Sequence, residues 1–159
     1  MKFYDGKKVL RQIQENEIDI TVNDDKGNTI LHVAAENGDS ETIKLLIGKG
    51  ADVSATNEDG YTPLVNAAKK GDLESVKTLI EDGGADATDN AVLHFAAWKG
   101  GDFETVKYIV GCNAEIYEGD IILSKTEEIK QYLQEAQVRR QRIKNMQKDG
   151  RSSTRLLQD

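Results

Sequence analysis

The feature that most constrains this chain is an internal repeat with a period of 33 residues. Residues 23–55 can be placed above residues 56–88 with an offset of 33 residues. The matching positions are Gly27 and Gly60, Thr29 and Thr62, Leu31 and Leu64, Ala34-Ala35 and Ala67-Ala68, and Gly38-Asp39 and Gly71-Asp72. A period of about 20–50 residues is typical of solenoids, in which one unit cannot bury its own apolar face but stacked units can.

A third copy of the unit, at residues 89–116, is shortened. Leu93 follows Leu64 by only 29 residues, so about four residues are missing from the connection between the copies. Gly101 is one extra residue before Asp102. The Gly-x-Thr-Pro segment is replaced by Asn90-Ala91-Val92, which leaves open whether a hairpin forms before this copy.

Each unit carries local signals for two helices. Pro63 suits the first position of a helix, where its missing N–H group would be unpaired anyway. Gly71 ends that helix in a conformation that costs little only for glycine. A second helix follows with an apolar stripe at Val76, Leu79 and Ile80. The unit is therefore predicted to be a helix-turn-helix followed by an extended connection.

The 33-residue spacing, with Thr-Pro-Leu and Ala-Ala in one helix and Gly-Ala-Asp after the next, resembles the ankyrin-repeat family. The resemblance covers roughly residues 5–135. It implies an all-α solenoid of stacked helix-turn-helix units with short β-hairpin or extended connections, plus a C-terminal helix. The chain departs from the family pattern at Ile30, which replaces a proline, and at Val65, which replaces a histidine.

Both ends of the repeat array resemble incomplete repeats. Ser124 and Glu127 have the spacing of a capping box at the start of the last helix. The predicted ankyrin-repeat domain, residues 1–135, consists of a cap at 5–22, repeats at 23–55, 56–88 and 89–116, and a second cap at 117–135. Residues 136–159 are predicted to form a basic helical extension that frays before Gly150, followed by a disordered tail.

Charge separates the extension from the rest of the chain. Residues 1–135 contain 14 lysines and arginines against 26 acidic residues, whereas residues 136–159 contain seven basic residues and two acidic ones. The acidic body argues against nucleic acid as its main ligand. The basic tail leaves an alternative function open, in which it binds RNA or an anionic surface and the solenoid is a carrier. Its charges surround the predicted helix, which disfavours membrane insertion.

Composition limits the compartment and the class of protein. The mean hydropathy is −0.58, and no apolar run approaches the ~20 residues that span a bilayer. One cysteine, Cys112, excludes an internal disulfide framework. We expect a soluble monomer of the cytoplasm or another reducing compartment, with translocation into a host cell left open.

No catalytic or metal-binding pattern is present in the sequence, so we expect no enzyme activity, no cofactor and no metal. The chain has no phosphate-binding loop and no metal-ligand spacing. The resemblance implies that His32 is a structural hydrogen-bonding residue. The same role is less firmly implied for His94, because Ala91 replaces its threonine partner. Cys112 follows a helix and is expected to be a buried or half-buried small residue.

The resemblance implies that the ligand is another protein, bound by hairpin tips and by the concave face of the inner helices. The matching positions are Asp25, Lys26, Asn28, Glu36, Asn37, Glu58, Asp59, Tyr61, Lys69, Lys70, Asn90, Trp98 and Lys99. Trp98 occupies a position that the other repeats fill with charged residues. It is either an interface anchor or a filler of the gap left by the missing hairpin. The predicted function is that of a non-catalytic adaptor, inhibitor or competitor.

Overall fold

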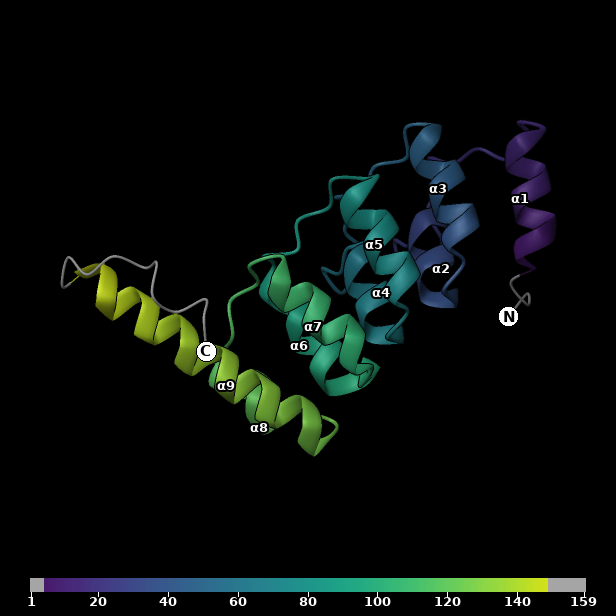
Figure 1. The fold of residues 1–159 in the computed structure, drawn as a ribbon. Coiled ribbons are helices and arrows are strands. Elements are labelled where there is room, and N and C mark those ends of the chain that lie inside the picture. The colour runs from purple at the N-terminus through teal and green to yellow at the C-terminus, as the bar shows by residue number, and fades with distance from the viewer. Residues whose placement is uncertain (1–4, 149–159) are drawn as a thin grey trace.

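A computed structural model, which describes residues 5–148, has the helices of the chain arranged in pairs that follow one another along the molecule (Figure 1). The inner layer contains α2 (Ile30–Asn37), α4 (Pro63–Lys70), α6 (Asn90–Phe95) and α8 (Glu118–Ile122). The outer layer contains α1 (Gly6–Gln14), α3 (Ser40–Gly48), α5 (Leu73–Glu81), α7 (Phe103–Gly111) and α9 (Glu127–Lys148). Because α2 packs on α4 and α3 packs on α5, the predicted all-α solenoid is confirmed.

The helix ends are fixed by the residues that the repeat pattern conserves within this chain. The Thr62 side chain caps α4, and Pro63 occupies the first turn. Gly71 ends α4 with a φ of 75°, in the left-handed region that favours glycine. The Asp72 side chain then caps α5 by accepting a hydrogen bond from the backbone of Ser75. These signals are local, which explains why the sequence predicts the helix pair.

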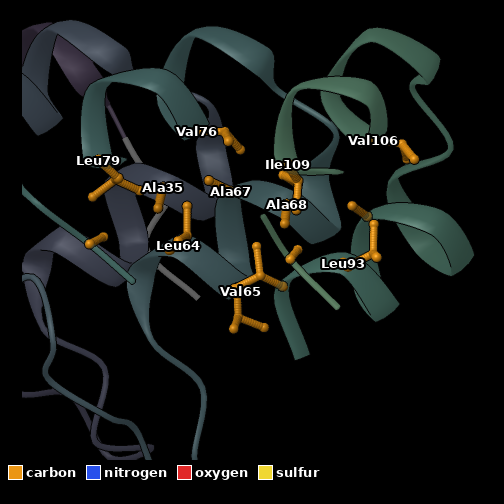
Figure 2. Close-up of a cluster of buried hydrophobic side chains, with 14 of the residues drawn as sticks. Ala35, Leu64, Val65, Ala67, Ala68, Val76, Leu79, Leu93, Val106 and Ile109 are labelled. Atoms are coloured by element: carbon orange, nitrogen blue, oxygen red, sulfur yellow. The ribbon is translucent and has the colours of Figure 1, made fainter. Parts of the chain in front are cut away.

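The core runs continuously between the two layers, as the labelled side chains in Figure 2 show. Small residues dominate the inner helices, where Ala67 and Ala68 are fully buried. The outer helices contribute larger buried residues such as Val76, Leu79 and Ile109. Alanine in the inner layer allows neighbouring helices to approach closely, so that leucine from one repeat packs against the next.

The third unit accommodates its extra residue by a π-helical turn, Ala96–Gly100, which continues α6. The backbone N–H of Gly101 donates to the carbonyl of Ala96 at 2.8 Å, which is the wide bond of a π turn. Gly101 then takes a φ of 63°, and Asp102 caps α7 as in the other repeats. The insertion is thus absorbed inside the helix, and the outer helix keeps its register.

Two fingers connect the first repeats, at residues 23–29 and 56–62. Within the first finger, an isolated antiparallel bridge pairs Asn23 with Thr29. The fingers are joined by a hydrogen bond from the Glu58 N–H group to the Lys26 carbonyl at 3.0 Å. Residues 49–62 connect α3 to α4 and include the second finger, whereas only residues 82–89 connect α5 to α6. The third repeat therefore has no finger.

The C-terminal cap is formed by α8 and the long α9, which runs well beyond the other helices in Figure 1. The predicted capping box of Ser124 and Glu127 is wrong: Thr126 Oγ1 accepts the hydrogen bond from the Ile129 N–H group. The Ser124 hydroxyl instead donates to the carbonyl of Asp120 in α8, and Thr126, the residue directly before α9, supplies the cap.

The helix α9 continues through the predicted boundary at residues 135–136 without a break. Ala136 is buried, and the Arg140 guanidinium donates to the carbonyls of Val110 (2.7 Å) and Ala114. Arg140 therefore docks α9 onto the end of α7. The predicted domain boundaries stay predictions, and the predicted disordered tail lies outside the described residues.

Candidate partner-binding surface

Four ring-bearing side chains gather on the inner-helix face of the second and third repeats. Phe95 lies at the centre: its ring centroid is 5.0 Å from that of Tyr61, 5.5 Å from His94 and 5.9 Å from Trp98. The His94 and Trp98 centroids are 5.8 Å apart. We call Tyr61, His94, Phe95 and Trp98 the aromatic cluster. Its edge-to-face and tilted geometry is the arrangement that aromatic pairs prefer.

The cluster arises from helical spacing and from one finger. Trp98 follows Phe95 by three residues and His94 by four on α6 and its π turn, so it shares a face with each of them. Tyr61 comes from the second finger, which ends next to the start of α4. The same face in the first repeat carries Glu36 instead of Trp98. The third repeat is therefore the apolar end of this face.

Two lysines lie over the rings. Lys69 Nζ is 5.8 Å from the Tyr61 ring centroid and 5.9 Å from that of Phe95. Lys99 Nζ is 4.3 Å from the Trp98 ring centroid. Ring faces carry partial negative charge and attract such cations. Both lysines are exposed, so the aromatic cluster is bordered by positive charge on a domain that is otherwise acidic.

The two histidines have different environments. His32 is fully buried; its Nδ1 accepts from the backbone N–H of Thr29 at 3.2 Å, and its Nε2 donates to the carbonyl of Tyr61 at 2.8 Å. Burial lowers the pKa of His32 below its ordinary value. The imidazole is thus a neutral link between the first repeat and the second finger, which is the structural role expected for His32.

His94 is bound to the next helix pair instead. Its Nδ1 donates to Asp120 Oδ1 at 3.1 Å, because a carboxylate only accepts hydrogen bonds. Asp120 is 3% exposed, and its Oδ2 accepts from the backbone N–H of Tyr117 at 2.8 Å. Within residues 5–148, no serine, threonine or cysteine side chain is hydrogen-bonded to His94. The pair orients an imidazole but, in that part of the chain, has no nucleophile beside it.

A small pocket opens where the third finger is absent. Its volume is about 290 Å³, and mainly apolar atoms line it. The lining residues are Asn90, Ala91, His94, Phe95, Tyr117, Gly119 and Asp120. We call it the finger-gap pocket. It adjoins the aromatic cluster through His94 and Phe95, and its volume is close to the ~300 Å³ lower limit of ligand pockets.

The structure brings only some of the predicted binding residues together. Tyr61, Lys69, Trp98 and Lys99 meet around Phe95, and Asn90 lines the adjacent pocket. The others lie on the two fingers or elsewhere on the inner helices: Asp25, Lys26, Asn28, Glu58 and Asp59 on the fingers, Glu36 and Asn37 on α2, and Lys70 on α4. Two of them are engaged within the fold. Asn28 accepts a hydrogen bond from Asn57, and Asn37 donates to the carbonyl of Val33.

Sequence reasoning missed Phe95, His94 and Asp120 as members of the surface. Phe95 replaces Val33 and Asn66 of the other repeats, so the comparison that singled out Trp98 could have found it. Asp120 carried no such signal, because it lies 26 residues from His94 and the two meet only when the cap stacks on the third repeat.

Outside this surface, the described residues offer little chemistry. Residues 5–148 contain no group of three or more His, Cys, Asp or Glu side chains placed to hold a metal ion. Asp24, in the acidic first finger, accepts backbone hydrogen bonds from Lys26 and Asn28. The side chain of Asn28 also donates to Asp24 and lowers its pKa.

Among residues 5–148, no helix is long and apolar enough to cross a membrane. The side chain of Cys112 is half-buried.

Comparisons with known proteins agree with the repeat pattern. A family model described as ankyrin repeats (3 copies) matches residues 3–91 and 50–120. These two overlapping matches span most of the chain. No curated protein matches it.

Proposed function

Because the chain belongs to the ankyrin-repeat family, whose repeats are generally protein–protein interaction modules, we propose that it binds a partner protein through the aromatic cluster and the fingers. The observation that carries this proposal is Trp98, which is 40% exposed and packs on the rings of His94 and Phe95. Exposed aromatic side chains of this kind dominate the binding energy of interfaces.

The pocket supports the role of Trp98 as an anchor over its alternative role as a filler. A side chain that filled the gap of the missing finger would lie in the finger-gap pocket. The residues that line the pocket do not include Trp98, and the pocket is open. Trp98 instead packs on His94 and Phe95, with Lys99 over its ring, and remains 40% exposed.

Preorganisation supports binding by a surface of this size. Phe95 is packed against three other rings, and the lysines are held over them, so little side-chain freedom is lost when a partner arrives. Three repeats and two caps offer a limited surface. We therefore expect an interface at or below the standard ~800 Å² per partner. The protein would act as an adaptor, inhibitor or competitor, without chemistry of its own.

The test is quantitative affinity capture from a nuclease-treated lysate of the cells that make the protein. The native chain would be compared with Trp98→Ala and with a matched control, Val138→Ala, which removes an apolar side chain that is 50% exposed on α9. We expect a captured protein that is retained by Val138→Ala and lost with Trp98→Ala. Equal capture by all three chains would contradict the proposal.

A chain that ends after Glu135 tests the alternative in which the basic tail binds RNA or an anionic surface. Because this chain lacks buried Ala136 and the docked Arg140, its circular dichroism and urea midpoint must first match those of the native chain. Two arginines of the basic tail are engaged within the fold: Arg140 on the end of α7 and Arg139 with Glu135 at 3.0 Å. This engagement favours the aromatic cluster over the tail. Capture that vanishes with the truncation or with nuclease, while Trp98→Ala has no effect, would assign the function to residues 136–159 instead.

A further inference from the structure

We propose that the partner presents a short acidic segment, that one apolar side chain of this segment enters the finger-gap pocket, and that Lys69 and Lys99 bind its carboxylates. This inference rests on the proposed function and specifies the chemistry of the partner. It depends on three observations: an open apolar pocket, a ring surface beside it, and lysines at its border.

The pocket has the size and lining of a side-chain site. At about 290 Å³ it is at the lower limit for a small-molecule ligand, for which pockets of ~300–1,000 Å³ are typical. Ala91, Phe95 and Gly119 contribute its apolar lining. The buried carboxylate of Asp120 already accepts hydrogen bonds from His94 and from the Tyr117 N–H group. An apolar side chain in the pocket therefore does not leave this carboxylate without hydrogen-bond partners.

The position of the pocket supports an occupant from outside. In the second repeat, the finger places the Tyr61 carbonyl against His32 and its ring against Phe95. The third repeat has no finger to supply the corresponding groups after His94. A partner segment bound in the finger-gap pocket would take the position that the finger takes in the second repeat. One apolar side chain of that segment would then lie where the third repeat has no finger side chain.

The lysines that lie over the rings of the aromatic cluster favour an acidic segment on that side of the pocket. Lys69 and Lys99 border the aromatic cluster, and exposed Lys70 follows Lys69 on α4. The first repeat, in contrast, carries Glu36 at the position of Lys69. Acidic side chains of the partner are thus favoured over the second and third repeats. A basic segment would be repelled there by cations that already occupy the ring faces.

His94 supplies a polar group at the edge of the same pocket. Its Nδ1 is committed to Asp120, and no described residue between 5 and 148 is hydrogen-bonded to its Nε2. Nε2 can therefore hydrogen-bond to the backbone or side chain of the segment. One polar group beside an apolar pocket is the composition that fixes the orientation of a ligand.

The first experiment titrates the full chain with three synthetic peptides. One has leucine flanked on each side by glutamates, the second has alanine in place of the leucine, and the third has lysines in place of the glutamates. Binding would be followed by the fluorescence of Trp98, the single tryptophan, and by amide chemical shifts. We expect the leucine peptide to shift residues 90–99 and 117–120. Its affinity should be about tenfold above that of the alanine peptide, and the lysine peptide should not bind.

Two variants with matched controls locate the site. Gly119→Leu places a side chain in the pocket, and a Cβ atom at Gly119 meets no atom within 4 Å; its control is Gly111→Leu on α7, where a Cβ atom also meets open space. A doubly charge-reversed variant, Lys69→Glu with Lys99→Glu, is compared with Lys7→Glu and Lys8→Glu on α1. We expect each test variant to lose about tenfold in affinity for the leucine peptide, and both controls to bind normally.

Each outcome separates this inference from the proposed function. No shift with the leucine peptide at millimolar concentration, or equal binding of the lysine peptide, overturns the inference. If capture of a protein then still depends on Trp98, the proposed function stands alone. If the peptide binds as expected but Trp98→Ala captures as much protein as the native chain, the pocket is assigned correctly. The proposal that Trp98 is the anchor of the interface is then wrong.

Discussion

The Nε2 atom of His32 lies 2.8 Å from the carbonyl oxygen of Tyr61, so the buried imidazole of the first repeat is hydrogen-bonded to the second finger. The variant His32→Leu would leave that carbonyl and the Thr29 N–H group without their partner. We expect the free energy of unfolding to fall by about 1–3 kcal/mol, the cost of leaving such groups unsatisfied. Urea unfolding followed by circular dichroism measures it, with exposed Glu36→Ala as a control that changes stability by less than about 0.5 kcal/mol.

The same imidazole makes stability depend on pH. Burial lowers the pKa of His32 below 6.5 in the folded chain, so the unfolded chain takes up a proton at a higher pH than the folded one. The stability from neutral His32 is therefore complete above pH ~6.5 and decreases as the pH falls below that value. Asp19, Asp24 and Asp86 have a pKa lowered from 3.8 by hydrogen bonds, so their contributions are lost only in more acidic solution.

Urea midpoints at about pH 7.5 and about pH 5.5, on either side of the ordinary histidine pKa, check this dependence. We expect a lower midpoint at the acidic pH for the native chain and a smaller difference for His32→Leu. The same difference in both chains would show that another group is responsible.

Gly100 lies at a close approach of the second and third repeats. A Cβ atom there would lie 2.4 Å from the Ala68 carbonyl oxygen and 3.1 Å from the Gly71 Cα atom. Gly100→Ala should therefore force the repeats apart and cost about 2–3 kcal/mol. Gly111→Ala is the control, because its Cβ atom meets open space; it should be neutral or slightly stabilising. Similar thermal midpoints for the two variants would contradict this close approach.

Much of the fold could be predicted because its signals are local. Thr62, Pro63 and Gly71 set the bounds of α4 wherever the helix packs. The extra Gly101 could be located in the sequence, but its effect could not, because a π turn forms only when the ends of the helix are already fixed by packing. The cap at Thr126 was mistaken for one at Ser124, since both side chains precede the same helix.

The candidate site was less accessible to sequence reasoning. Trp98 stood out against Glu36 and Lys69 at the same repeat position. The pocket beside it could not be predicted. It exists because the connection before the third repeat is shortened, and Asp120 from the next unit lines it. Arg140 interrupts the apolar stripe of α9 in the sequence, yet it is a docking residue, because the carbonyls of Val110 and Ala114, at and just beyond the end of α7, lie opposite it.

The junction between the second and third repeats should open first. The first two repeats are joined by hydrogen bonds between their fingers, from Glu58 to Lys26 and from Asn57 to Asn28. The third repeat has no finger to make such bonds. We therefore expect amide hydrogen exchange to be faster in residues 84–95 than in residues 30–47. Equal protection of the two segments would contradict this expectation.

The docking of α9 makes Arg140 the residue that joins the extension to the solenoid. Its guanidinium donates to the carbonyls of Val110 and Ala114, near the end of α7. Hydrogen bonds to charged groups contribute about 1.5–3 kcal/mol, so we expect Arg140→Ala to lower the free energy of unfolding by about 2 kcal/mol. Arg139→Ala removes a neighbouring, exposed arginine that forms an ion pair with Glu135 and should cost less than about 0.5 kcal/mol. Urea unfolding of both variants would decide the matter: equal losses would mean that Arg140 contributes no more than a surface charge.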